Sequence, residues 1–335
     1  MARRHTSLRL LLATALLALI PLGGWWSWVR EGPLQSEVTV LVPRGTTVGA
    51  LAERLESQGV IRSATIFKLW ARQRKLQLIR GEYTFAPRAS LETVAGKLRR
   101  GEIHTTLVVI TPTMTAWGVQ KRLKDFIPEE VFWKLWRSPR LAATAGFPEA
   151  ATLEGLLAPA TYKLHHALEP EEILLEMVTA FHKQVRLRLE GGPLPPYETL
   201  ILASLAEKET SLPEELPRVA GVYLQRLNIG MRLQCDPTSL YARWLTGDLR
   251  VTPPTTDDIH HPHPFNTYTV SGLPPTPIGI PGPAAVAAAR NPEITKDLYF
   301  VATGRGGHNF SKNLVEHNRN VGKFREEVKR QRRSR

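Results

Sequence analysis

The chain has 335 residues, a formal net charge of +13, a single cysteine and 42% hydrophobic residues. This length is enough for two or three domains with buried cores. Because Cys235 is the only cysteine, the chain can form neither an internal disulfide nor a cysteine metal site. The composition therefore excludes a disulfide-stabilised scaffold, and stability has to come from packing.

The positive charge is concentrated at the two ends of the chain. Residues 1–30 carry +4 and residues 323–335 carry +5, which leaves +4 for the whole middle of the chain. A surface with so little excess charge does not indicate nucleic acid as a partner. The basic tail, residues 323–335, is expected to be a solvated helix end that touches anionic lipid or an anionic wall polymer.

The first 30 residues carry a membrane signal. Arginines in residues 1–9 precede an apolar run, residues 10–29, that ends in three tryptophans. About 20 residues at ~1.5 Å each span the ~30 Å hydrocarbon core. A cleaved signal peptide is the alternative, but no small-x-small cleavage site follows the run. We expect a single-pass protein of the cell (inner) membrane, with a cytoplasmic N-terminus at residues 1–9 and the rest extracytoplasmic.

Residues 37–125 are predicted as a small α+β region. Strands are expected at 37–43, 82–85 and 106–110, and helices at 48–59, 64–75 and 91–101, with Thr47 and Ser90 as N-caps. The strand and capping threonine at 38–51 reappear, displaced by 68 residues, at 106–119, where Thr115 takes the capping place. This similarity indicates either related modules or two ordinary strand–helix units.

Residues 126–322 are predicted as a larger mixed α+β domain. Residues 126–200 are mainly helical with a break at 153–162, and their core aromatics are expected to be Phe132, Trp133 and Trp136. Further helices are expected up to Glu209, at 284–289, at 311–321 and at 215–228, where the apolar positions are Val219, Val222, Tyr223 and Leu227. Residues 251–282 are dense in Pro, Gly, His and Thr and should form an ordered loop layer over a cleft, without regular helices. A strand is expected at 297–301.

The segment Ile201-Leu-Ala-Ser-Leu-Ala-Glu-Lys-Glu209 places carboxylates at the end of an apolar helix. With 3.6 residues per turn, Glu209 shares a stripe with Leu202 and Leu205, while Glu207 shares a face with Ala203. A carboxylate on an apolar stripe loses hydration, so its pKa rises and it can act as a general acid near neutral pH. The alternative is that both glutamates are solvated at a fraying helix end.

Other polar clusters are less specific. Gln234, Asp236 and Thr238 are expected on a turn where they could bind hydroxyl or amide groups, although an Asp-Pro turn needs no ligand. His260, His261 and His263 crowd together, but no carboxylate at helical spacing completes a metal site. A glycine-rich turn is expected to place His308 at a cleft edge. Whether any of these four histidines contacts substrate stays open, and neither a metal nor a cofactor is expected.

Together these segments resemble the endolytic murein transglycosylases of the YceG-like (MltG) family. The resemblance covers most of residues 150–320 and rests on Leu202-Ala-Ser-Leu-Ala-Glu-Lys-Glu-Thr210, Val222-Tyr-Leu-Gln-Arg-Leu-Asn-Ile-Gly-Met-Arg-Leu-Gln-Cys-Asp-Pro-Thr238, Asn266-Thr-Tyr-Thr-Val-Ser-Gly-Leu-Pro-Pro275, Ile280-Pro-Gly282 and Tyr299-Phe-Val-Ala-Thr-Gly-Arg-Gly-Gly-His-Asn-Phe310. Residues 37–125 resemble the family's LysM-like region more loosely. Two departures are Ala160, where the family usually has Asp, and Cys235, where a small polar residue is common.

The resemblance implies a lytic transglycosylase that cleaves the β-1,4 bond between N-acetylmuramic acid and N-acetylglucosamine in nascent glycan strands and so terminates their elongation. It implies a 1,6-anhydro product, Glu209 as the catalytic acid and later base, and peptidoglycan strands and synthases as partners. Gln234, Asp236, Asn266 and Tyr268 are predicted to bind the sugars. The rival hypotheses are a non-catalytic, membrane-anchored peptidoglycan-binding scaffold and a muramidase that uses water.

Overall fold

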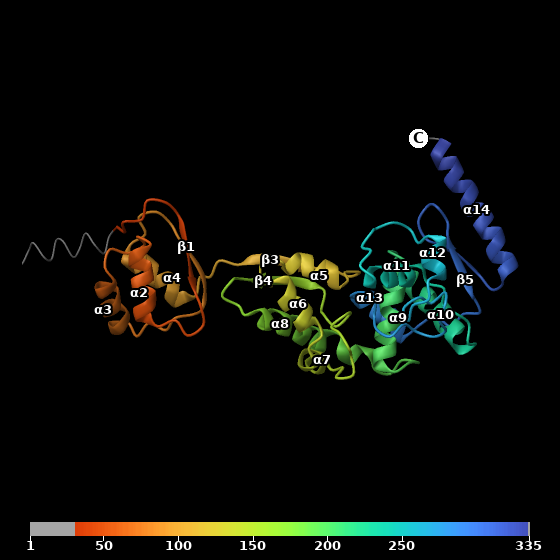
Figure 1. Ribbon diagram of the computed structural model, residues 1–335, viewed down its shortest axis with the longest axis horizontal. Coiled ribbons are helices and arrows are strands. Elements are labelled where there is room, and N and C mark those ends of the chain that lie inside the picture. Colours follow the sequence, from red (N-terminus) through yellow and green to blue (C-terminus); the bar gives the residue numbers. More distant parts are fainter. Residues whose placement is uncertain (1–30, 334–335) are drawn as a thin grey trace, which may run out of the picture. The chain divides into compact units, whose positions relative to one another are not determined.

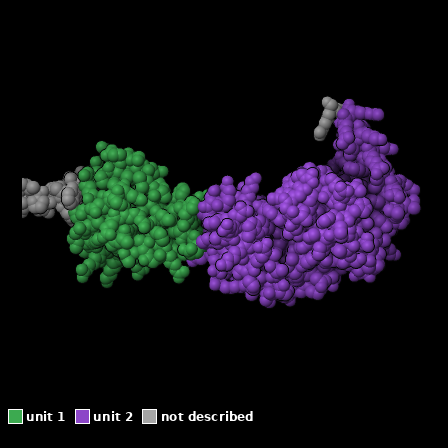
Figure 2. Space-filling view, in the orientation of Figure 1, with its two compact units in different colours: residues 1–107, 163–169 green, residues 108–162, 170–335 purple. Residues whose placement is uncertain are grey.

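A computed structural model describes residues 31–333 of the chain. These residues form two compact units (Figure 2). Unit 1 comprises residues up to 107 together with 163–169, and unit 2 comprises 108–162 and the residues from 170 onward. Both contain helices and short strands (Figure 1), which confirms the predicted α+β class. The predicted membrane span, residues 10–29, lies outside the described residues; no helix within 31–333 is both long and apolar enough to cross a bilayer.

Unit 1 packs three helices against an antiparallel pair of strands. Its elements are β1 (Val38–Val42), α2 (Val48–Ser57), α3 (Ala64–Gln73), β2 (Gly81–Phe85) and α4 (Leu91–Arg100). In the β1–β2 ladder Val38 lies opposite Phe85 and Val42 opposite Gly81. The inward residues of these elements, among them Val40, Leu55, Phe67, Tyr83 and Leu98, form one buried core.

Local capping explains why the sequence predicted these helices well. The Thr47 hydroxyl accepts the amide of Ala50, and the Ser90 hydroxyl accepts the amide of Thr93, each at 3.1 Å. Gly101 ends α4 in the left-handed conformation, with φ of 64°. Each signal needs only neighbouring residues, so it can be read from the chain directly.

Unit 2 is mainly helical. Its elements are α5 (Ala116–Leu123), α6 (Glu129–Trp136), α7 (Pro139–Ala145), α8 (Pro170–Gln184), the 3₁₀ turn η1 (Arg186–Leu189), α9 (Pro196–Glu209), α10 (Leu216–Asn228), α11 (Asp236–Leu245), α12 (Thr256–His260), α13 (Pro283–Arg290), β5 (Tyr299–Ala302), β6 (His308–Ser311) and α14 (Leu314–Arg333). Two further strands, β3 (Thr106–Ile110) and β4 (Ala160–Leu164), pair with each other, and the boundary between the units falls inside both.

Helix α9 lies at the centre of unit 2. It packs against α10, α11 and α13 (Figure 1), and every residue from Thr199 to Ala206 is buried. The stripe that Glu209 shares with Leu202 and Leu205 is therefore not distinguished by burial, because residues 199–206 are buried on every face of the helix. The register of the helix alone does not distinguish Glu207 from Glu209. The two carboxylates differ in the groups that they contact.

The N-terminus of α5 is capped from a distance. Thr115 occupies the predicted cap position, but its side chain makes no capping hydrogen bond. Instead the amide of Ala116 donates to Glu154 Oε2 at 3.0 Å, and the hydroxyl of Tyr241 donates to the same oxygen at 2.9 Å. Glu154 is only 1% exposed, so this carboxyl ties three separate segments together inside unit 2.

Residues 251–282 are largely irregular, as predicted, but they contain one helix that was not expected. Thr255 and Asp258 form a reciprocal capping box at the start of α12. The buried guanidinium of Arg243 on α11 binds Asp258 at 2.7 Å and so fastens this helix. At the C-terminal end, β6 was also missed, and α14 continues through the basic tail to Arg333.

Candidate active site

Unit 2 contains a pocket of about 500 Å³ beside the end of α9. Its walls come from α9, α10, the segment entering α11, the hairpin β5–β6 and α14. The lining residues are Glu209, Arg226, Leu233, Gln234, Asp236, Tyr268, Tyr299, Phe300, Val301, Ala302, His308, Leu314 and His317. Three of the four predicted sugar-binding residues are thus brought to one pocket with Glu209, although 32 residues separate Asp236 from Tyr268.

Glu209 is the last residue of α9 and is half-buried in the pocket wall. Tyr223, one of the residues of α10 that faces α9, donates its hydroxyl to Glu209 Oε1 at 2.7 Å. The Cys235 thiol is a second hydrogen-bonding partner of this carboxyl. Glu209 is therefore fixed by protein contacts on one side and reachable from the pocket on the other.

Burial raises the pKa of Glu209 above its ordinary value. Hydrogen bonds from Tyr223 and Cys235, and His308 when its ring is protonated, act in the opposite direction, while the nearby Asp236 adds to the increase. The loss of hydration outweighs these donors, so the protonated form persists to higher pH than in water. A carboxyl with a raised pKa at the wall of a pocket is suited to act as a general acid.

Glu207 makes a different contact. Its Oε2 accepts the amide of Gly282 at 2.9 Å, and it does not line the pocket. Burial also raises the pKa of this carboxyl. A raised pKa therefore does not single out the acid, whereas position does: Glu207 fastens the loop before α13, and Glu209 meets the pocket.

Gln234 and Asp236 line the pocket from the segment that enters α11. Gln234 adopts a left-handed conformation with φ of 49°, and its backbone amide donates to the backbone carbonyl of Thr267. Asp236 is the first residue of α11 and does not lie on a turn, which corrects the sequence prediction. Thr238 is fully buried, where its hydroxyl bonds to the Thr267 hydroxyl.

Tyr268 lines the pocket, and its hydroxyl donates to Asp236 Oδ1. Asn266 does not: it is fully buried, and its side-chain nitrogen donates to the carbonyls of Asp258, Ile259 and His261 at 2.8–3.0 Å. Its Oδ1 accepts the amide of Tyr268 at 3.1 Å. The predicted sugar-binding role of Asn266 is therefore replaced by a structural one, holding the loop that presents Tyr268.

Several residues of the pocket and its surroundings were not assigned from the sequence. Tyr223 does not line the pocket but donates to Glu209, and the sequence predicts it only as an apolar position of its helix. Arg226 is 6% exposed, and its guanidinium donates to the carbonyls of Leu298 and Leu233 at 2.6 Å. His317 stacks on Tyr299 with 5.2 Å between ring centroids. None of these side chains carries a signal beyond helical periodicity, because their partners are distant in the sequence.

The predicted core aromatics of α6 are partly confirmed. Phe132 and Trp136 are buried, whereas Trp133 is half-buried and meets Trp117 edge to face.

Among the described residues, no three His, Cys, Asp or Glu side chains are grouped as metal ligands.

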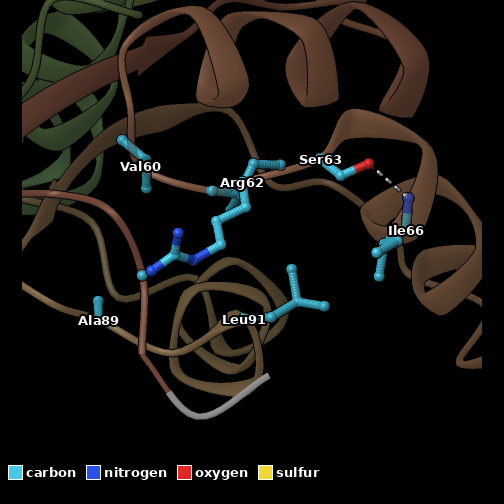
Figure 3. A pocket seen from close by; sticks show the side chains of 8 residues that line it. Val60, Arg62, Ser63, Ile66, Ala89 and Leu91 are labelled. Carbon is cyan, nitrogen blue, oxygen red and sulfur yellow. Dashed lines mark hydrogen bonds between the residues drawn. The ribbon is translucent and has the colours of Figure 1, made fainter. Parts of the chain in front are cut away.

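Unit 1 also contains a pocket, which is much smaller (Figure 3). Val60, Arg62, Ser63, Ile66, Ala89 and Leu91 surround it, and the Ser63 hydroxyl accepts the amide of Ile66. Its volume of about 10 Å³ is close to that of one water molecule. A saccharide does not fit there, so the pocket at Glu209 is the better candidate of these two.

Comparison with known proteins places the chain in a family. Residues 40–323 match the YceG-like family, and the chain belongs to it. A curated endolytic murein transglycosylase of Bacillus subtilis is 27% identical over 318 residues, covering 88% of this chain and 86% of the relative. One of Streptococcus pneumoniae is also 27% identical, covering 91% of this chain, and the match spans 63% of the length of that relative.

A solved structure agrees with this assignment. The crystal structure of a yceG-like protein from Listeria monocytogenes matches with a TM-score of 0.56 at 29% sequence identity, and the match covers 85% of this chain and 99% of that one. The family resemblance inferred from the motifs is thereby confirmed.

Proposed function

We propose that the chain is an endolytic lytic transglycosylase of peptidoglycan that cleaves the β-1,4 bond between N-acetylmuramic acid and N-acetylglucosamine. The observation that carries this proposal is the Glu209 carboxyl, whose pKa is raised by burial and which lines a pocket large enough for sugar rings. The names of the curated relatives support the same activity.

In the proposed reaction, protonated Glu209 donates its proton to the glycosidic oxygen as the bond to C1 breaks. The C6 hydroxyl of the same sugar then attacks C1 and closes the 1,6-anhydro ring, while its proton passes to a base in the pocket. The nucleophile is intramolecular, so its effective concentration is high and no water has to be held in place.

A hydrolytic muramidase is the strongest rival, because the pocket holds a second carboxylate. Asp236 lines it together with Glu209, and hydrolytic glycosidases use two such groups. However, Asp236 Oδ1 already accepts the hydroxyl of Tyr268. A carboxylate engaged in this way is better suited to orienting a ligand than to attacking C1.

The chemical nature of the new chain ends separates the candidates. The full-length chain would be incubated with un-crosslinked glycan strands, and the products would be analysed by mass spectrometry. Lytic transglycosylation leaves anhydro ends, a muramidase leaves reducing ends, and a non-catalytic scaffold leaves the strands intact. Reducing ends or intact strands from active, folded protein would contradict the proposal.

The setting of this activity is also part of the proposal. The apolar sequence of residues 10–29 supports a single-pass anchor in the cell membrane, with the units on the extracytoplasmic side. The looser resemblance of residues 37–125 to a LysM-like region supports glycan binding there. Peptidoglycan synthases would then be neighbours at the membrane, where nascent strands emerge. Fractionation of cells that produce the chain with and without residues 10–29 would test the anchor.

A further inference from the structure

A histidine and a glutamate from distant parts of the sequence meet at the wall of the Glu209 pocket. His308 begins β6 and lines the pocket, and Glu215 immediately precedes α10. The His308 ring nitrogen Nδ1 lies 2.7 Å from Glu215 Oε2. Both side chains are largely shielded, at 14% and 15% exposed, so solvent screens the pair only weakly.

Glu215 holds His308 by two atoms. In addition to the ring contact, Glu215 Oε1 accepts the backbone amide of His308 at 2.7 Å. The Thr210 hydroxyl donates to Glu215 Oε2 at 3.1 Å, which fixes the carboxylate in turn. Burial would raise the pKa of Glu215, but the donors from His308 and Thr210 bring it below its ordinary value. Glu215 is therefore an acceptor, and Nδ1 carries the donated proton.

The turn between β5 and β6 permits this close approach. Gly307 has φ of 77°, and a Cβ atom at this position would lie 2.7 Å from Glu215 Oε1. Only glycine leaves room there for the carboxylate. Ala302 lies opposite His308 in the hairpin, and the ring of Phe300 meets that of His308 edge to face at 5.4 Å. The imidazole is thus fixed by its backbone, its ring neighbour and its carboxylate partner.

A carboxylate on Nδ1 selects the tautomer in which Nε2 carries the lone pair, and it stabilises the imidazolium that forms when Nε2 takes a proton. Nδ1 is occupied by Glu215, so Nε2 is the ring nitrogen left to act toward the pocket. This is the arrangement of an oriented general base.

We propose that His308, oriented by Glu215, is the base that accepts the C6 hydroxyl proton in the reaction proposed for this pocket. This inference rests on the proposed function. The Glu209 proton passes to the glycosidic oxygen, which leaves with the electron pair of its bond to C1. The C6 oxygen forms the new bond to C1, and its proton passes to Nε2. Glu209 ends as carboxylate and His308 as imidazolium, and exchange with water returns both to their starting states.

The contacts of Glu209 favour this division of roles. Glu209 Oε1 accepts the Tyr223 hydroxyl, and the Cys235 thiol is a further partner of this carboxyl, so only part of its capacity remains to serve the saccharide. If Glu209 also took the C6 proton, as predicted from the sequence, this partly engaged carboxyl would have to serve the departing and the attacking oxygens in turn. A separate base removes this requirement.

The test is chemical rescue in the full-length chain. His308→Ala is expected to lower kcat for anhydro-product formation by roughly 100- to 10,000-fold, the usual contribution of general base catalysis, with little change in KM. Added imidazole should restore part of the lost rate. Glu215→Gln retains an acceptor but loses the charge, and should lower kcat by a smaller factor. His182→Ala, an exposed histidine of α8, is the matched control and should keep wild-type rate without any response to imidazole.

Circular dichroism establishes that each variant is folded, and the half-saturating glycan concentration establishes that it binds its substrate. If the alanine variant unfolds, His308→Gln replaces it. Full activity in a His308 variant, or a loss that imidazole does not restore, would overturn the role of His308 while wild-type protein still makes anhydro ends. Wild-type protein that makes no anhydro ends would instead overturn the proposed function, and this inference with it.

Discussion

The hydroxyl of Tyr223 on α10 donates a hydrogen bond to Oε1 of Glu209 at the end of α9, at 2.7 Å. Tyr223 is 1% exposed, and its ring meets Phe300 edge to face at 5.8 Å, so the hydroxyl has little freedom to turn away. With Oε1 accepting this bond, the proton that Glu209 donates in the proposed reaction belongs on Oε2. In that reaction Tyr223 selects the oxygen that serves the substrate.

Replacing Tyr223 by Phe should move the pH profile of the proposed activity. The hydroxyl stabilises ionised Glu209, so its loss raises the pKa of this carboxyl further. In the proposed reaction protonated Glu209 is the active acid, so activity should fall as pH rises through its pKa. The alkaline limb of the kcat profile should therefore move up by about 1 pH unit, corresponding to ~1.4 kcal/mol. Tyr83→Phe, a buried tyrosine of unit 1, should leave the limb in place; a downward shift in Tyr223→Phe would contradict this relationship.

Asn266 should matter for stability more than for substrate affinity. Asn266 is itself fully buried and its side-chain nitrogen donates to three backbone carbonyls, so Asn266→Asp places a buried carboxylate against acceptors and should cost roughly 3 kcal/mol. Guanidinium unfolding of the variant beside Asn228→Ala, an exposed asparagine of α10, measures this loss. Unchanged stability together with a large rise in KM would restore the sugar-binding role predicted from the sequence.

The glycines before His308 offer a matched pair. Gly306 and Gly307 both have positive φ, at 91° and 77°, so an alanine at either costs about 1–2 kcal/mol of backbone strain. Only at Gly307 would the new Cβ also meet Glu215 Oε1, whereas the space around Gly306 is open. Gly307→Ala should therefore lower kcat far more than Gly306→Ala in the product assay. Equal kcat in the two variants would show that the contact between Glu215 and His308 is dispensable.

Glu154 should make stability depend on pH. Burial raises the pKa of this carboxyl from 4.5 to about 7, even though Ala116 and Tyr241 donate to it. The folded state then binds more protons than the unfolded state between these values, so stability is highest at low pH and falls as pH rises through 7. The stability that Glu154 contributes at low pH and that is lost over this range is ~3 kcal/mol. Relative to Glu154→Gln, wild-type protein should lose this amount between pH 4.5 and 8 in thermal unfolding, and Glu130→Gln, an exposed residue of α6, should follow wild type.

The elements that the sequence predicted correctly depend on neighbouring residues. Thr47, Ser90 and Gly101 mark helix ends through contacts three or four residues away, and the apolar run before Glu209 identifies α9 by its length. The motif Glu-Lys-Glu also located the carboxylate that reaches the pocket. These signals are carried by the chain itself and do not need the fold.

The contacts that were not predicted join distant segments. Glu215 and His308 are 93 residues apart, and Glu154 and Tyr241 are 87 apart. Periodicity predicts that a residue is buried but not which partner it contacts. The sequence therefore placed Tyr223 among the apolar positions of its helix and did not predict its bond to Glu209. The prediction of Thr115 as a helix cap failed for the same reason. The amide of Ala116 donates to the buried Glu154 carboxyl, which is distant in the sequence, and not to the Thr115 side chain.

The most direct test of the central claim compares Glu209→Gln with Glu207→Gln. Both remove one carboxylate from the end of α9, but only Glu209 lines the pocket, and a glutamine at 207 can still accept the amide of Gly282. We predict that Glu209→Gln folds normally and forms no anhydro ends. Glu207→Gln should keep its rate within about threefold of wild type, a smaller effect than the free energy of one net hydrogen bond would produce. Full anhydro formation by Glu209→Gln would contradict the assignment of the acid.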